Sequence, residues 1–190
     1  MLRLGRDQYA VTGFENKIPF LKNLLAALCG KPDLKFLEVG SFAGASAEWL
    51  LRNVLTHETA ALTCVDIWND RPDSAQKELI LPGSEEVFYE TVAPFAEKVS
   101  PIKGRSQEKL KTLKPSSFDF IFIDGSHETP DVLTDAILAL SLLKTGGVMV
   151  FDDFSPNSGV FMAVNFFLEA FKNSLEVLHE EHFVAVKRIL

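Results

Sequence analysis

The sequence is poor in the features that mark secreted and membrane proteins. Only 2 of its 190 residues are cysteines, and both lie in apolar surroundings, so Cys29 and Cys64 are expected to be buried free thiols in a reducing compartment. The opening MLRLGRDQYAVTGF has no apolar core followed by a small-residue cleavage site. No apolar run approaches the roughly 20 residues that cross a bilayer. The sequence therefore predicts a cytoplasmic protein without a membrane partner.

Basic residues are also scarce. Lys and Arg number 19 against 26 Asp and Glu, the net charge is −7, and no stretch is rich in Lys or Arg. Such a chain has no global positive field to attract nucleic acid. The length of 190 residues and the 47% of apolar residues suit one globular domain. We expect a single domain over 1–190, with an N-terminal helical segment over 1–33.

Internal repeats are missing too, and short apolar runs alternate with amphipathic periods. Apolar runs without alternation are typical of strands buried on both faces of a parallel sheet. Right-handed crossovers through the intervening helices give a doubly wound, mostly parallel α/β fold, and a hairpin pattern near the C-terminus adds an antiparallel strand. The predicted strands are 35–39, 60–68, 99–104, 118–125 and 146–153, and the predicted helices are 19–32, 45–55, 84–99 with a local break at Pro94, 106–113, 130–143 and 159–173.

Carboxylates follow four of the five predicted parallel strands. In an open α/β sheet, ligands bind beyond the carboxyl ends of the strands, so these side chains are expected to meet at one edge. Roles in turns or helix caps would explain one or two of them, but four at one edge indicate a binding site. The strand ends carry Glu38, Asp66, Asp124 and the pair Asp152 and Asp153, while the third strand ends at Gly104, Arg105 and Ser106.

The segment EVGSFAGAS follows the first strand and contains Gly40 and Gly44. Glycines there allow a sharp turn and a close approach of a ligand to the backbone. Asp66, at the end of the next strand, can accept hydrogen bonds from both hydroxyls of a ribose, with Trp68 near a purine ring. These features predict a nucleoside-containing cofactor. The alternative is a strand–turn–helix glycine pair beside a solvent-facing aspartate.

The dinucleotide fingerprint G-x-G-x-x-G is missing. Phe42 stands where the second glycine would leave the backbone bare for a pyrophosphate, and Glu38 would repel that group. A nicotinamide-dependent oxidoreductase is therefore disfavoured. A cofactor with a cationic amino group and no phosphate fits better, and S-adenosylmethionine has both properties.

Five segments in order, FLEVGSFAGAS, CVDIW, PIKGRS, FDFIFIDGSH and GGVMVFDDF, resemble class I S-adenosylmethionine-dependent methyltransferases. They are most similar to the small-molecule O-methyltransferase-like family that carries an Ile-Asp-Gly-x-His segment after the fourth strand. Cephalosporin-biosynthesis and macrolide-sugar methyltransferases belong to this neighbourhood. The resemblance runs from about Leu34 to Asp153. It implies a seven-stranded sheet with an antiparallel last strand, and O-methylation of a small-molecule acceptor.

The resemblance also implies where the cofactor would bind. Its methionine part is expected at the turn after the first strand, its ribose and adenosine at the end of the second, and its adenine beside the third. The predicted cofactor site comprises Glu38, Gly40, Ser41, Phe42 and Gly44, then Asp66, Ile67 and Trp68, then Gly104 and Ser106, and finally Asp124.

A metal site is predicted at the same edge. Asp124 ends the fourth strand, and Asp152 and Asp153 end the fifth, about 5 Å away if the strands are neighbours. Like charges this close raise the pKa of one carboxylate unless a cation lies between them. Ligands that are all oxygens favour Mg²⁺ or Ca²⁺, and Mg²⁺ with retained waters suits a transferase. Catechol-type relatives hold Mg²⁺ against a substrate diol with three such side chains. The alternative is that Asp152 and Asp153 merely form turns.

His127 lies three residues after Asp124. In catechol-type relatives a basic residue at this offset takes the proton of the acceptor hydroxyl, so His127 and Asp124 are the predicted catalytic pair. The alternatives for His127 are an exposed loop histidine or a hydrogen-bond partner at the helix start before Pro130. Asp135 is expected on the solvated face of its helix, and His179 on the surface of the C-terminal hairpin.

The irregular stretch within 69–95 is predicted to be a lid or substrate region, unless a second subunit of a homo-oligomer supplies the lid. A protein of the same fold that binds S-adenosylmethionine or another nucleoside without chemistry stays open as a rival. The sequence does not identify the acceptor.

Overall fold

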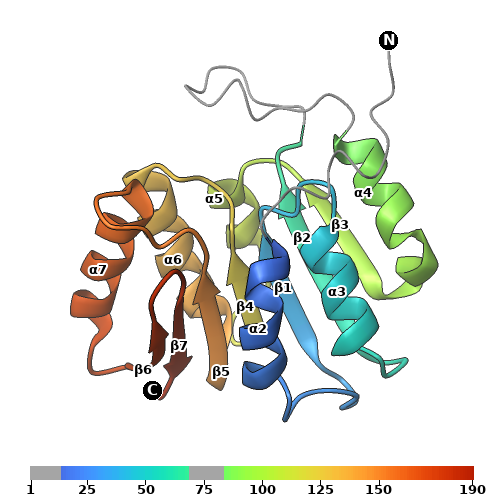
Figure 1. Ribbon diagram of the computed structural model, residues 1–190, viewed down its shortest axis with the longest axis horizontal. Helices are drawn as coiled ribbons and strands as arrows, with labels where there is room; N and C mark the ends of the chain where they lie inside the picture. Colours follow the sequence, from blue (N-terminus) through green and yellow to red (C-terminus); the bar gives the residue numbers. More distant parts are fainter. Residues whose placement is uncertain (1–13, 69–83) are drawn as a thin grey trace.

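The computed structural model describes residues 14–68 and 84–190 (Figure 1). Within these residues, seven strands form one sheet in the order β3-β2-β1-β4-β5-β7-β6. The strands are β1 (Lys35–Val39), β2 (Ala61–Asp66), β3 (Val99–Lys103), β4 (Phe118–Ile123), β5 (Leu143–Phe151), β6 (Leu175–Glu180) and β7 (Val184–Arg188). The α-helices are α2 (Ile18–Leu24), α3 (Ala45–Asn53), α4 (Ser84–Val92), α5 (Ser106–Lys109), α6 (Thr129–Leu142) and α7 (Gly159–Phe171), and the 3₁₀-helices are η1 (Phe14–Lys17), η3 (Ala93–Lys98) and η4 (Leu110–Thr112).

The pairing of the strands confirms the predicted fold. β1 pairs in parallel with β2 and β4, and the parallel register continues to β3 on one side and β5 on the other. β7 lies between β5 and β6 and is antiparallel to both. The result is a doubly wound, mostly parallel sheet of seven strands with an antiparallel C-terminal strand.

Alternation along the strands divides the core into two layers. Phe120 and Phe122 pack in one apolar cluster with residues of α2, α3 and α4, whereas Ile121 and Ile123 pack in another with residues of α6 and α7. Figure 1 shows these helices on opposite faces of the sheet. Successive side chains of a strand point to opposite faces, so strands covered on both sides must be apolar throughout. This explains why the strand runs carry no polar alternation.

Two sequence predictions about local structure fail. The helix expected over 19–32 ends at Leu24, and the chain continues through turns, with Leu28 N–H bonded to the Leu25 carbonyl at 2.8 Å. Cys29 lies in these turns and is exposed, not buried, while Cys64 is buried as expected. The predicted break at Pro94 is confirmed, because α4 passes into the 3₁₀-helix η3 there.

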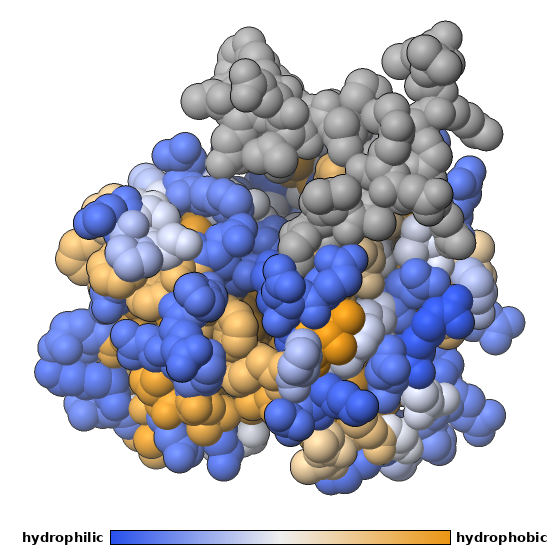
Figure 2. All heavy atoms as spheres, in the orientation of Figure 1, coloured by the Kyte–Doolittle hydropathy of each residue, from blue (hydrophilic) through white to orange (hydrophobic). Residues whose placement is uncertain are grey.

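Apolar side chains also reach the surface. Figure 2 shows them gathered over α7 and the β6–β7 hairpin, where Met162, Phe166, Val177 and Leu178 are exposed.

Among the described residues, no helix combines the length and the apolar character that crossing a membrane requires.

Candidate active site

The carboxyl ends of β2, β1, β4 and β5 bring the predicted acidic residues to one edge of the sheet. Glu38 lies in register between Cys64 and Phe122 of the neighbouring strands. Beyond the strand ends the ladder continues, since the Asp124 N–H donates to Val39 O at 2.8 Å and the Asp152 N–H to Ile123 O at 3.0 Å. Strand alternation directs Glu38, Asp66, Asp124 and Asp152 to the face that α2 and α3 cover.

The two glycines after β1 are required by the packing of the chain itself. Gly40 has φ +89°, and a Cβ atom there would lie 2.0 Å from the carbonyl oxygen of Asp124. Gly44 has φ +86° and caps α3, where a Cβ atom would lie 3.1 Å from Phe88. The space beside Gly40 is therefore filled by the backbone at the end of β4, not kept open for a ligand as the sequence suggested.

Asp66 holds the β1–α3 turn against the end of β2. Its Oδ2 accepts a hydrogen bond from the Phe42 N–H at 2.8 Å, and its Oδ1 accepts one from the Trp68 N–H at 2.5 Å. Phe42 and Trp68 both have positive φ, +43° and +42°, which is uncommon for large side chains. Each carboxylate oxygen keeps a second lone pair, so Asp66 can still accept from a ligand.

Trp68 belongs to the core. Only 3% of it is exposed, its ring lies 5.0 Å from that of Phe88, and its indole N–H donates to Phe42 O at 2.9 Å. Ile67 is half-buried, so it is the accessible one of the two residues predicted to flank the adenosine.

Glu38 is completely buried. Burial raises the pKa of Glu38, and the nearby hydroxyls of Ser41 and Ser46 oppose this shift only in part. The Cys64 thiol lies 3.7 Å from Glu38 Oε2, whereas Glu38 Oε1 and Ser41 Oγ are buried without a hydrogen-bond partner of ordinary geometry. Unpaired buried acceptors are costly, so this corner of the site suits a ligand that brings donors.

Ser106, predicted near the adenine, donates to Asp135 Oδ2 at 2.9 Å. Asp135 is 1% exposed, so its predicted place on the solvated face of α6 is wrong. It shares the buried face of this helix with Val132, Ala136 and Ala139, and that spacing was the missed signal. Burial raises the pKa of Asp135 to about 7, partly offset by the Ser106 hydrogen bond.

Asp135→Asn is expected to stabilise the protein in a pH-dependent way. With a folded pKa of about 7 against an ordinary value of 3.8, the wild-type group binds more protons when folded, so it costs stability as pH rises from about 4 to 7. The cost is complete above pH 7 and of the order of 4 kcal/mol at most. Urea unfolding of both proteins at pH 5 and pH 8 measures it. A stability difference that does not grow between these pH values would contradict the assignment.

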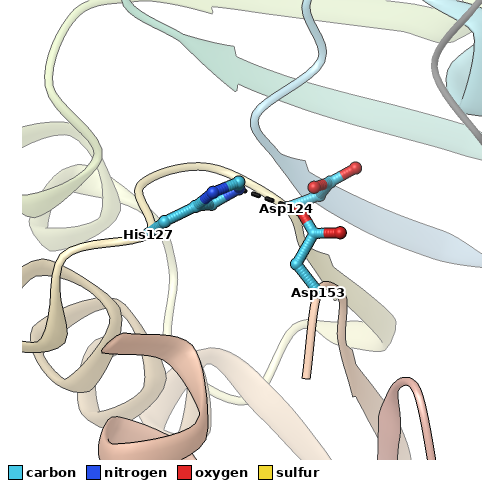
Figure 3. A group of neighbouring side chains, drawn as sticks. All are labelled: Asp124, His127 and Asp153. Carbon is cyan, nitrogen blue, oxygen red and sulfur yellow. Dashed lines mark ion pairs between the residues drawn. The ribbon is translucent and has the colours of Figure 1, made fainter. Parts of the chain in front are cut away.

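The second half of the edge holds three carboxylates and two basic side chains. His127 Nε2 lies 2.9 Å from Asp153 Oδ2, and Figure 3 shows the imidazole directed across the loop toward Asp124 and Asp153. One ligand atom from each of these three residues lies within 4.8 Å of the others. The hydrogen bond from His127 lowers the pKa of Asp153, whereas burial and the charge of Asp152 raise the pKa of Asp124 well above its ordinary value.

Lys17, the last residue of η1, is the site residue that sequence reasoning missed. Its ammonium group forms an ion pair with Asp152 Oδ2, and the Lys17 side chain is 17% exposed. The other oxygen of Asp152 accepts the Asp153 N–H at 2.7 Å. The two partners of this ion pair are 135 positions apart in the chain, so no local motif joins them.

The residues do not fit the predicted three-carboxylate Mg²⁺ site. Asp152 Oδ2 is already paired with the Lys17 ammonium, so a metal ion bound there would lie beside another cation. The grouping that the structure forms instead, Asp124, His127 and Asp153, includes an imidazole nitrogen, while Mg²⁺ prefers oxygen ligands. A small pocket beside it is lined by residues of β4, the loop after it, the end of β5, α6 and α7, including Ser126, Phe151 and Val160.

A family model described as a methyltransferase domain matches residues 37–154, which is more than half of the chain. The chain belongs to this methyltransferase family. The matched range contains every carboxylate of the edge described above, from Glu38 to Asp153. The predicted membership of a methyltransferase family is thereby confirmed.

Several curated proteins match about two thirds or more of this chain at about 30% identity. A protein of Mycobacterium sp. (strain JLS) named "Putative O-methyltransferase" is 31% identical over 148 residues, which are 77% of this chain and 60% of that protein. An uncharacterised protein of Acanthamoeba polyphaga mimivirus is 30% identical over 138 residues, 68% of this chain and 56% of that protein. The chain spans only about half to three fifths of the length of the curated relatives it matches.

Solved structures with the same fold include two O-methyltransferases. The enzyme from Bacillus cereus, in complex with SAH, has a TM-score of 0.63 at 20% identity and covers 94% of this chain and 82% of its own. TomG from Streptomyces achromogenes, involved in tomaymycin synthesis and in complex with SAM, has a TM-score of 0.66 at 21% identity and covers 95% and 82%. At these identities the likeness establishes the Rossmann-like methyltransferase fold and no more.

Proposed function

We propose that this protein transfers the methyl group of S-adenosylmethionine to an oxygen atom of a small-molecule acceptor. The observation that carries the proposal is the row of carboxylates Glu38, Asp66 and Asp124 on adjacent strands, within the range that the methyltransferase family model matches. The O-methyltransferase names of relatives and the SAM and SAH complexes of structural neighbours support it.

In this proposal the two ends of the edge have different tasks. Glu38 and Ser41, with their unpartnered buried oxygens, would accept donors from the methionine ammonium end of the cofactor. Asp66 would accept from the ribose hydroxyls, and Ile67 and Ser106 would lie beside the adenosine. The bound cofactor supplies an already activated methyl group, so the protein chiefly has to orient the acceptor oxygen.

His127 is the proposed base for the acceptor proton. Its pairing with Asp153 at 2.9 Å fixes the orientation of the imidazole and stabilises the charge that it gains with the proton. Asp124 lies beside this pair, where the cofactor end and the acceptor end of the edge meet.

Calorimetric titration tests the proposal against its rivals. We expect S-adenosylmethionine and its demethylated product to bind and NADH not to bind, with and without Mg²⁺. Binding of NADH in their place would favour an oxidoreductase. Cofactor binding without transfer of a labelled methyl group to any of a panel of hydroxylated small molecules would favour a binding protein. The same titration tests the Mg²⁺ assistance predicted from the sequence, against which the ion pair of Asp152 with Lys17 argues.

Asp66→Ala is expected to weaken S-adenosylmethionine binding by about tenfold or more. The variant loses both a carboxylate acceptor for the ligand and the hydrogen bond that the Phe42 N–H donates to Asp66. Asp119→Ala is the matched control. Asp119 also accepts a backbone N–H, that of Lys35 at 2.9 Å, but lies at the opposite end of β4. Equal cofactor affinities in the two variants and the wild type would show that Asp66 does not hold the ribose.

A further inference from the structure

Lys17 is held over the acidic edge by buried neighbours on both sides. Phe14 packs edge-to-face against Phe122, with ring centroids 6.4 Å apart, and Phe122 precedes Asp124 by two residues on β4. Leu21, one turn after Lys17, is 2% exposed. Residues three and four apart share one face of a helical segment, so this face carries Phe14, Lys17 and Leu21 to the sheet together.

The start of α2 is also fixed to the C-terminal hairpin. The ring of Phe20 lies 4.5 Å from that of His179 and 4.3 Å from that of Phe183, and His179 stacks on Phe183 at 4.6 Å. His179 is therefore part of a packed aromatic cluster and not the surface residue that the sequence suggested. The position of Lys17 is therefore fixed by the fold, because Phe14, Phe20 and Leu21 of the same segment all pack against the rest of the protein.

Carboxylates surround the Lys17 ammonium. A lysine ammonium is ordinarily protonated at neutral pH, and this one is paired with Asp152 and lies near Asp124 and Asp153. Of these carboxylates, Asp153 is also paired with His127. A divalent ion bound at Asp152 Oδ2 would have to displace the ammonium or lie beside it, and two cations a few ångströms apart repel strongly.

We propose that Lys17 is the resident cation of this edge and keeps divalent metal ions out of it. The inference deepens the proposed function and rests on it where it concerns the reaction. Methyl transfer would then proceed without a metal ion, because an ammonium group occupies the place where the sequence predicted Mg²⁺. Lys17 acts as a positioning residue, since it holds Asp152 and offsets the charge beside Asp124.

Binding of Mn²⁺, followed by the loss of the free-ion signal in electron paramagnetic resonance, tests the proposal independently of activity. We expect no binding to the wild type up to about 1 mM Mn²⁺, the weak end of protein sites for divalent ions. Lys17→Met is expected to gain at least about tenfold in affinity, because the competing charge is gone. Lys17→Arg keeps the charge and is expected to behave like the wild type. Lys17→Met/Asp152→Asn is expected to lose the gain.

Lys144→Met is the matched control, because it removes the same charge from an ion pair with Asp119 at 2.7 Å, far from the edge. It is expected to leave Mn²⁺ binding unchanged. Sub-millimolar binding of Mn²⁺ to the wild type would overturn the proposal, and this measurement needs no variant to fold. Equal affinities of Lys17→Met and Lys144→Met would also overturn it. Neither result depends on S-adenosylmethionine, so a failure here is distinct from a failure of the proposed function.

Discussion

Gly40→Ala is expected to destabilise the protein by about 4 kcal/mol or more, which is exceptional for the addition of a single methyl group. The added Cβ would lie 2.0 Å from Asp124 O and 2.4 Å from Asp124 C, and backbone atoms cannot swing away as a flexible side chain would. The φ of +89° adds strain for any residue with a Cβ atom. Denaturant unfolding at 25 °C measures the loss.

Comparison with Gly146→Ala separates the loss of stability caused by the clash from the loss caused by backbone strain. Gly146 has nearly the same φ, +83°, but no atom within 4 Å of the added methyl group, so this variant is expected to lose only about 1 kcal/mol. Similar stabilities of the two variants would mean that the turn after β1 can move away from β4. In that case Gly40 would be needed for a ligand, and Gly40→Ala would fold normally but bind S-adenosylmethionine weakly.

The fold could be predicted because the residues of each strand are sufficient to identify it as a buried strand. The continuous apolar runs KFLEV and FDFIFI became β1 and β4, and right-handed crossovers between such runs predict a doubly wound sheet. The carboxylates at the strand ends could be predicted for the same reason, since a parallel sheet brings the ends of its strands to one edge. The positions of these carboxylates directly after the apolar runs were sufficient to predict that they meet at one edge.

The partners of those carboxylates could not be predicted, because they come from packing between distant segments. Lys17 reaches Asp152 from a short 3₁₀-helix whose direction is set by Phe14 and Leu21. Ser106 and Asp135 meet across 29 positions, and the spacing of Asp135 with Val132 and Ala139 indicates its buried face but not the partner it meets there. The role of Gly40 was misjudged for a similar cause, since the sequence gives no sign that the Asp124 carbonyl lies against it.

His127→Ala is expected to lower kcat by about 10²- to 10⁴-fold and to leave the affinity for S-adenosylmethionine unchanged. The imidazole faces Asp124 and Asp153, at the β4–β5 end of the edge, while the proposed ribose contact lies at the end of β2. Transfer of a labelled methyl group to an acceptor found by screening hydroxylated small molecules gives kcat. His57→Ala is the matched control, because His57 is a loop histidine before β2, hydrogen-bonded to Thr59 at the other end of the sheet.

Asp153→Asn distinguishes a base from a histidine that merely supports the loop. The carboxylate orients His127 and favours its protonated form, so the variant is expected to lose activity by about tenfold and to shift the acidic limb of the pH–rate profile to lower pH. The sign follows because a base that loses its negative partner holds its proton less tightly and stays neutral in more acidic solution. An unchanged profile, or a His127→Ala variant that keeps kcat within about twofold of the wild type, would remove His127 from the chemistry, because general bases contribute far more than that.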